Sequence, residues 1–506
     1  MTPTVRNVAY NLAGQALPMA VALVALPILV HSAGTERLGF LGLTWALIGY
    51  FALLDLGLSR VVTRRISIAQ AHHTLHVEVQ VLRRLCVWLF LGVAAISLIL
   101  ALAIPPTLLL GKNASPALIE EARIALPILW ATVPLTVVIG LLRGALEGLQ
   151  RFARTNLLRG VFGMWSFAAP LAVLPWTAAL GWLTAAITLG RVLSLVAHVR
   201  STSTALKEEA EAEERNRGLV RPSAANSGTT APAPTPPFAS GPALAPLLRE
   251  GGWLTASNVV GPMMVTFDRF VIAAMVSLTA ASYYFVPQEI ALRLLLVPGA
   301  IATTVFPMLA RMKGFDAGRQ QISTRALLAI GASSLPPCAL LAALAGPLIA
   351  VWMGHEFATH SAPVAAILAF GLFTNCCAQA PFAWIQAAGR ADVTGKLHLL
   401  QLPLYLALLV GLTWQMGIVG TALAWSARAL VDCALLFRAS SVLFPGVALS
   451  SAVPLLLSGT TFLGLIAALQ FVDLGRFQMP VGITLLVAAL GISGIMLMRL
   501  VKDIQR

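Results

Sequence analysis

Long apolar stretches separated by short polar segments repeat along the whole chain. No charged residue occurs between Leu85 and Gly111, or between Ala326 and Gly354. A helix needs roughly 20 apolar residues to cross a bilayer, and both stretches exceed that length. The stretches lack the alternation of polar and apolar residues that is typical of membrane β-strands. The pattern therefore predicts an all-α, polytopic membrane protein.

The same length rule predicts about 14 membrane-spanning helices. The first apolar stretch is too long for a cleaved signal peptide and no small-residue cleavage site follows it, so we expect it to remain as an anchor. The expected helices cover residues 8–30, 38–59, 85–110, 124–142, 160–176, 178–199, 252–276, 281–309, 325–352, 362–388, 397–415, 417–437, 449–471 and 479–498.

Composition supports this interpretation. Of the 506 residues, 58% are hydrophobic and only 11% are charged, whereas soluble domains are about 25% charged. The composition therefore excludes a set of water-soluble domains. The net charge of +14 would suit a nucleic-acid partner, but in a membrane protein it indicates topology, because cytoplasmic loops collect Lys and Arg. We predict no nucleic-acid partner.

The distribution of basic residues predicts the orientation of the chain. If the N-terminus is inside and the 14 helices alternate, most of the 34 Lys and Arg residues fall in inner segments. The outer segments contain only Arg37, Lys112, Arg123 and Arg476. This bias follows the positive-inside rule. It predicts a multi-pass protein of the cytoplasmic (inner) membrane with both termini in the cytoplasm.

A polar segment divides the chain into two similar halves. It carries mixed charges and then a Pro-rich tract, which predicts a flexible or extended cytoplasmic linker. An offset of 239 pairs Arg151 with Arg390, and an offset of 237 pairs Arg191 with Arg428. Two parallel six-helix bundles around a central site are a transporter architecture. We predict an N-lobe of helices 1–6 (1–200), a linker (201–249), a C-lobe of helices 7–12 (250–438), and an accessory helix pair with a tail (439–506).

Seven ionisable residues fall inside predicted spans, where each costs about 2.5–3.5 kcal/mol unless it faces protein or water. Glu289 and Arg293 are four residues apart, as are Arg428 and Asp432, so each pair could form an internal salt bridge or contact a substrate. The nearest acid to Arg269 is poorly aimed, which favours a place lining a cavity. Arg191 has no acid on its own helix, and both interpretations stay open. The seven residues are Arg191, Asp268, Arg269, Glu289, Arg293, Arg428 and Asp432.

Other polar residues give weaker indications. Asn11 and Asn258 stand early in each half and could contact sugar hydroxyls, although hydrogen bonding between helices is the commoner use. The histidines between 72 and 76 lack a Cys or acid that would complete a metal site. No nucleophile–base pair stands out. We therefore predict no metal site, no cofactor and no enzymatic activity.

Four stretches together carry a resemblance to a known family. They are YFALLDLGLSR, LEGLQRFARTN, WLTASNVVGPMMVTFDRFVIA and GIVGTALAWSARALVD. In their order and coverage of most of residues 7–438, they resemble the polysaccharide flippases (Wzx-type O-antigen transporters) of the multidrug/oligosaccharidyl-lipid/polysaccharide exporter superfamily. The resemblance implies two six-helix lobes, alternating access, and transfer of a lipid-diphosphate-linked oligosaccharide from the cytoplasmic to the outer leaflet.

The resemblance gives the intramembrane arginines a role. Arginine suits a diphosphate because its planar guanidinium makes bidentate contacts and stays charged, so Arg269, Arg293 and Arg428 are the best candidates for phosphate or acidic-sugar contacts. The expected partners are a polyprenyl diphosphate sugar, membrane lipids and, as a further candidate, the polysaccharide polymerase or glycosyltransferase machinery. The alternatives are a multidrug or cation exporter of the same superfamily, and a membrane polysaccharide polymerase or ligase.

Overall fold

The chain folds into α-helices over the part that the structure describes. The computed structural model describes residues 3–51, 58–71, 75–111, 113–219, 260–261, 263–311, 317–388, 390–443, 453–472 and 478–505. Within these ranges the regular structure is helical and no strand occurs. The predicted all-α architecture is confirmed.

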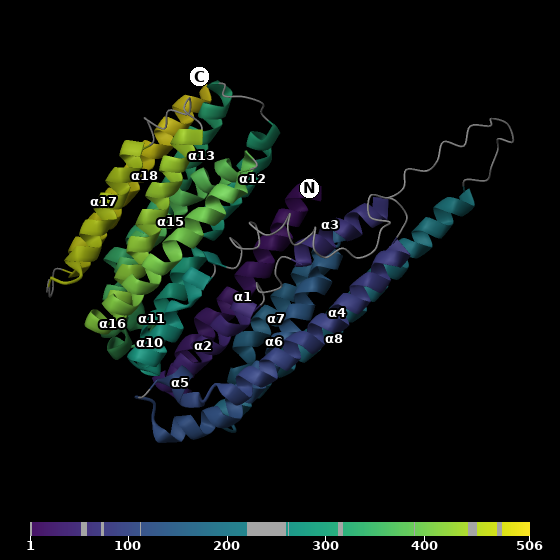
Figure 1. The fold of residues 1–506 in the computed structure, drawn as a ribbon. Helices are drawn as coiled ribbons and strands as arrows, with labels where there is room; N and C mark the ends of the chain where they lie inside the picture. The colour runs from purple at the N-terminus through teal and green to yellow at the C-terminus, as the bar shows by residue number, and fades with distance from the viewer. Residues whose placement is uncertain are drawn as a thin grey trace. The chain divides into compact units, whose positions relative to one another are not determined.

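Figure 1 shows the helices in chain order from purple to yellow. Their bounds are α1 Pro3–Ala33, α2 Thr35–Phe51, α3 Leu58–Ala71, α4 Leu75–Ala103, α5 Pro106–Leu110, α6 Pro116–Gly148, α7 Phe152–Val173, α8 Leu180–Leu219, α10 Asp268–Met275, α11 Leu278–Arg293, α12 Leu296–Arg311, α13 Ala317–Ala343, α14 Ala345–Met353, α15 His355–Ala387, α16 Ala391–Leu443, α17 Val453–Leu469 and α18 Gln478–Gln505.

Nine of the described helices contain a stretch long and apolar enough to cross a membrane. One of them, α16, holds two predicted spans. It bends at Gly417, whose backbone is not helical (φ 58°, ψ −136°), between the predicted helices 397–415 and 417–437. Glycine tolerates this conformation because it has no Cβ. The chain is therefore a multi-pass membrane protein, as predicted.

Two elements differ from the prediction. The short helix α3 was not expected. Its three arginines keep its mean hydropathy too low for a span, and its polar and apolar residues separate onto opposite faces. The helix α8 continues to Leu219, although residues from 201 onward were predicted to be a flexible linker. Its last turns are rich in Ala, Glu and Arg, which favour helix. Arg154 donates to Glu208 at 2.6 Å. The remainder of the linker lies outside the described residues.

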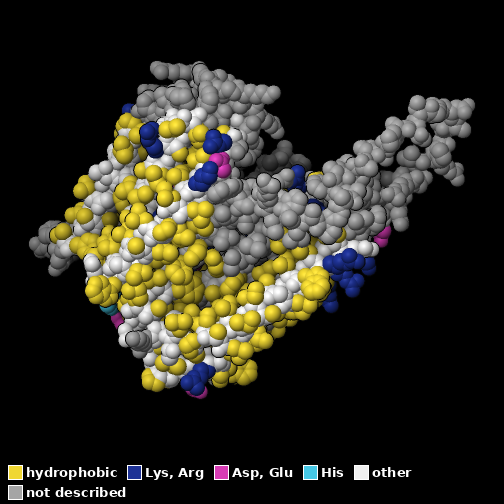
Figure 2. All heavy atoms as spheres, viewed as in Figure 1, with side chains coloured by type: hydrophobic (Ala, Val, Ile, Leu, Met, Phe, Trp, Pro, Cys, Tyr) yellow, Lys and Arg dark blue, Asp and Glu magenta, His cyan; other side chains and the backbone are white. Residues whose placement is uncertain are grey.

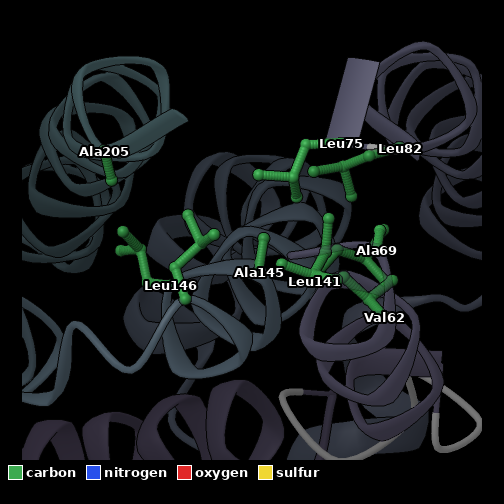
Figure 3. Close-up of a cluster of buried hydrophobic side chains, with 10 residues drawn as sticks. Val62, Ala69, Leu75, Leu82, Leu141, Ala145, Leu146 and Ala205 are labelled. Atoms are coloured by element: carbon green, nitrogen blue, oxygen red, sulfur yellow. The ribbon is translucent and has the colours of Figure 1, made fainter. Parts of the chain in front are cut away.

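The described helices form two compact units. Unit 1 comprises residues 1–25, 47–104 and 123–259. Its core includes a buried cluster to which α3, α4, α6 and α8 all contribute (Figure 3). The α3 and α6 helices approach closely because Gly144 of α6 lacks a side chain: a Cβ there would lie 2.4 Å from the backbone oxygen of Ser59. Small residues at helix contacts allow such close packing in membranes.

Unit 2 comprises residues 26–46, 105–122 and 260–506. Its helices α13, α15, α17 and α18 pack side by side, as Figure 1 shows, and α15 is buried along most of its length. On the face drawn in Figure 2, hydrophobic side chains predominate and Lys and Arg appear in small groups, as expected for a surface that contacts lipid. The division into two lobes and a helix pair stays a prediction.

Candidate functional site

Two predicted spans are interrupted where their charged residues lie. In the predicted span 252–276, a turn at Phe267 precedes α10, which begins at Asp268. In the predicted span 281–309, α11 ends at Arg293 and α12 begins at Leu296. Phe267 and Leu294 keep right-handed helical backbone angles, so both positions are short turns within a span rather than unwound segments. Both interruptions belong to unit 2, and the residues between them form one network.

Three charged residues of this network form a continuous chain of ion pairs. The Nη2 of Arg269 donates to Oε1 of Glu289 at 2.9 Å, and the Nη2 of Arg293 donates to Oε2 of the same carboxylate at 3.1 Å. Arg269 also donates from Nε to Gln288 at 2.7 Å. One carboxylate is thus shared by two guanidinium groups, and Asp268, buried beside Arg269, is the acid that balances the formal charge of the network. The Arg269 side chain is 2% exposed, whereas that of Arg293 is 34% exposed.

Asp268 is a second, separate acceptor in the same network. Its side chain is fully buried. Its carboxylate accepts from the hydroxyl of Tyr284 at 2.6 Å, from Nε2 of Gln288 at 2.7 Å, and from the backbone nitrogen of Arg269 at 2.8 Å. The hydrogen bond from Arg269 to Asp268 comes from the backbone nitrogen of Arg269, not from its guanidinium. Arg269 instead pairs with Glu289 on α11, so any contact with a substrate requires this network to open.

The pair Arg428 and Asp432 behaves differently from the pair Glu289 and Arg293, despite the same spacing. Asp432 accepts from Nε2 of Gln401 at 2.9 Å and lies 3.8 Å from Nε2 of His398. Among the described residues, Nε and Nη2 of Arg428 have no hydrogen-bond partner. The internal salt bridge between these two residues, one of the two predicted alternatives, is therefore absent from the described structure.

Aromatic rings surround Arg428 in place of a carboxylate. Its guanidinium carbon lies 5.6 Å from the ring centre of Trp425 and 5.8 Å from that of Tyr405. The side chain is only 7% exposed. A buried cation without a hydrogen-bonded acid is costly, and two cation–π contacts offset only part of that cost. Arg428 is thus a buried cation with donor capacity to spare.

The remaining predicted residues lie elsewhere. Arg191 is in unit 1, on α8, where its Nη2 donates to the hydroxyl of Ser166 at 3.4 Å. The side chain of Asn11 and the whole of Asn258 lie outside the described residues. Within the part of the chain that the structure describes, no group of three His, Cys, Asp or Glu side chains could hold a metal ion.

Several polar residues around these charged groups were not predicted from the sequence. Gln288 and Tyr284 stand on the α11 face that meets Asp268. His398, Gln401 and Tyr405 follow each other at intervals of three and four residues, which places them on one helix face. Polar residues at helical spacing inside an apolar span could have indicated this cluster. Uncharged side chains cost less in a membrane than ionised ones, so they are weaker evidence for a site.

A cavity of about 340 Å³ lies apart from the network, in the part of unit 2 predicted to face outward. Its lining includes Gly34, Glu36, Arg37 and Thr279. The carboxylate of Glu36 accepts from the backbone nitrogen of Ser115 at 2.9 Å. A hydrogen bond from Arg37 to Glu121 raises the pKa of the Arg37 guanidinium. These bonds tie the start of α2 to the start of α6.

Comparison with known structures assigns the fold. Over 99% of this chain and 100% of the other, the structure is similar to that of the lipid II flippase MurJ in an inward closed conformation, with a TM-score of 0.67 and 13% identity. It is also similar to an inward-facing multidrug resistance MATE family transporter of the MOP superfamily, over 87% of this chain and 99% of that one, with a TM-score of 0.63 and 15% identity. The chain has the fold of the MOP-superfamily transporters.

Sequence comparisons agree with the fold. The family described as "Polysaccharide biosynthesis protein" matches residues 233–363, a range that contains the Asp268–Arg293 network. A putative O-antigen transporter of Shigella flexneri is 27% identical over 432 residues, which cover 85% of this chain and 96% of that protein. The resemblance to polysaccharide flippases that was predicted from the sequence is confirmed.

Proposed function

We propose that this protein is a flippase that moves a lipid-diphosphate-linked oligosaccharide from the inner to the outer leaflet of the cytoplasmic membrane by alternating access. The similarity to a putative O-antigen transporter over most of both chains supports this proposal. The shared fold with MurJ supports a transport mechanism rather than an enzymatic one. The protein is therefore a transporter and not an enzyme.

The observation that carries the proposal is the partly exposed arginine of the ion-pair network, Arg293. Arg269 and Arg293 share the single carboxylate of Glu289. Because Arg293 is one-third exposed, it is the member of the network that an anion can reach. A diphosphate would gain charge-assisted, bidentate hydrogen bonds there. A phosphate or sugar hydroxyl that enters hydrocarbon without such partners loses its hydrogen bonds to water and gains none in return, which costs free energy.

The cation-exporter alternative fits these residues less well. A transported cation needs an acid that is free to receive it. Asp268, Glu289 and Asp432 each already accept hydrogen bonds from at least one side chain. Two of the arginines, by contrast, can still donate to a ligand. Nε and Nη2 of Arg428 have no hydrogen-bond partner among the described residues, and the side chain of Arg293 is partly exposed. This balance favours an anionic substrate.

Further parts of the proposal follow from the sequence. We place both termini in the cytoplasm and assign the two lobes to 1–200 and 250–438, with the pair 439–506 as an accessory element. Arg191, Arg428, Asn11 and Asn258 are proposed to face the transport path when it is open. The polymerase or glycosyltransferase machinery is a proposed partner, because it would supply the substrate or consume the product.

Replacing Arg293 by Ala tests the proposal. In cells that depend on this protein for surface polysaccharide, we expect Arg293→Ala to reduce export at least tenfold, at equal protein level, while the lipid-linked precursor accumulates. Arg293→Lys should restore export only in part, because an ammonium group cannot make the bidentate contact.

Arg390→Ala is the matched control, because Arg390 is an exposed arginine that also pairs with a nearby acid, Asp392. It should leave export unchanged. Normal export by Arg293→Ala would refute the proposed substrate site. No precursor accumulation in cells that lack the whole protein would refute the proposed function.

A further inference from the structure

The ring of Phe285 lies between α2 and the buried ion pairs. A Cβ built on Gly42 of α2 would lie 2.6 Å from this ring, so the ring fits there only because residue 42 is glycine. The ring of Trp45, also on α2, lies 6.1 Å away, centre to centre. The guanidinium carbon of Arg269 lies 5.5 Å from the centre of the same ring. Phe285 is 1% exposed and therefore packed on all sides.

A second glycine brings α2 against the start of α11. A Cβ built on Gly39 would lie 2.0 Å from the backbone oxygen of Leu278, which is closer than any non-bonded contact allows. Leu278 is itself only 1% exposed. We call the packing of Gly39 and Gly42 against Leu278 and Phe285 the α2–α11 contact. Its residues all belong to unit 2, next to segments predicted to be extracytoplasmic.

We infer that Phe285 is a positioning residue that couples the Arg269–Glu289–Arg293 network to the α2–α11 contact. The inference rests on the proposed alternating-access function. It adds a physical connection through which a change at the charged residues alters the packing of the α2–α11 contact. The negative face of an aromatic ring attracts a guanidinium group. A close-packed ring cannot follow the guanidinium on one side without shifting its neighbours on the other.

The network can change the position of Arg269. Two side-chain acceptors hold its guanidinium: Gln288 and Glu289. Glu289 is shared with Arg293, so an anion that draws Arg293 away alters the bonding of Glu289 to Arg269. The ring of Phe285 transmits this change to Gly42 and Trp45. The outer contact thus loosens or tightens according to the state of the charged site, which is the coupling that alternating access requires.

A buried reporter in the α2–α11 contact makes the coupling measurable. Leu278→Cys, in a chain whose five native cysteines are replaced by alanine, places a thiol where the closed contact covers it. The rate of its reaction with a membrane-impermeant maleimide, added to intact cells, reports opening on the outer side. Each variant is first checked for a single elution peak in detergent.

The decisive measurement is a double-mutant cycle. Glu289→Gln removes the charge that holds Arg269, so we expect the labelling rate to rise about fivefold or more, a typical coupling between two sites. Phe285→Leu removes the ring and should raise the basal rate. In the Phe285→Leu background, Glu289→Gln should then have no further effect. An equal increase in both backgrounds, or no increase with Phe285 present, would overturn the inference.

Two further variants keep the test decisive. Glu356→Gln is the matched control, because Glu356 also accepts a hydrogen bond from α11, at 3.0 Å from the Tyr283 hydroxyl, but belongs to α15. It should leave the labelling rate unchanged. Gly42→Ala displaces the ring from the α2 side without replacing a residue of the network, and should raise labelling even if Phe285→Leu does not fold. Unchanged labelling in Gly42→Ala would contradict the inference.

The outcome is independent of the transported substrate. The labelling cycle uses no lipid-linked sugar, so it can fail while Arg293→Ala still abolishes export, in which case only the coupling through Phe285 is wrong. Conversely, a coupled labelling cycle together with normal export by Arg293→Ala would leave the conformational route in place and remove the proposed substrate site.

Discussion

Arg269 and Glu289, twenty residues apart in the sequence, form a 2.9 Å ion pair in which the arginine is 2% exposed. The guanidinium is therefore a buried cation that depends on one shared carboxylate and one amide oxygen. Removing one partner of a buried pair leaves an uncompensated charge, whereas removing both does not. The same pair also links α10 to α11, so its loss is expected to affect stability as well as transport.

A double-mutant cycle on this pair should show strong coupling. We expect Glu289→Ala to destabilise the protein, by about 3–5 kcal/mol if Arg269 is left unpaired, and the combined Arg269→Ala and Glu289→Ala variant to be less destabilised than the sum of the single changes. The apparent melting temperature in detergent measures this. Removing the exposed pair Arg390 and Asp392 should shift it little, because solvent screens exposed ion pairs. Additive effects at Arg269 and Glu289 would contradict the burial argument.

Asp268 is expected to tolerate loss of its charge poorly. In Asp268→Asn, the new amide directs a donor towards a site where Tyr284, Gln288 and a backbone nitrogen already donate. One donor would lose its acceptor, at a cost of about 1–3 kcal/mol. Thermal unfolding should therefore show a larger loss for Asp268→Asn than for Tyr284→Phe, which removes only one donor. The reverse order would mean that the carboxylate is not the centre of this network.

Arg428 should separate stability from transport. The variant Arg428→Met removes a buried cation whose Nε and Nη2 lack hydrogen-bond partners, but it keeps apolar packing against Trp425. We expect the melting temperature to stay equal or rise, and export to fall at least tenfold if the spare donors receive an acidic group of the substrate. Arg438→Met, on the same helix but exposed, is the control and should export normally. Full export by Arg428→Met would assign Arg428 a structural role only.

Two glycine-to-alanine changes should have opposite effects on stability. A Cβ at Gly144 would lie 2.4 Å from the Ser59 backbone oxygen, whereas a Cβ at Gly92 meets nothing within 4 Å. Gly144→Ala must push α3 away from α6 and should lower the melting temperature. Gly92→Ala lies within a helix, where alanine is favoured by about 0.5–1 kcal/mol, and should leave the temperature equal or raise it. Equal effects would mean that the two helices do not approach this closely.

Helix positions could be predicted well, and side-chain pairing much less so. Hydropathy located the spans, and even the boundary inside α16 was placed next to Gly417. The turns at Phe267 and between Arg293 and Leu296 were not predicted. Hydropathy shows that a segment is apolar, but it does not show where the regular helical hydrogen bonding is broken by a turn. The helical α8 extension was missed because a charged segment was taken to be unstructured.

The sequence by itself determined that the chain is helical, that it crosses a membrane many times, and that a few arginines must be sheltered from lipid. These follow from local hydropathy and charge, which each residue carries with it. Only the tertiary structure decided which acid each arginine meets. Glu289–Arg293 and Arg428–Asp432 have the same spacing, yet only the first pair forms. Spacing along a helix makes a pair possible, but neighbouring helices supply the competing partners, here Gln401 and His398 for Asp432.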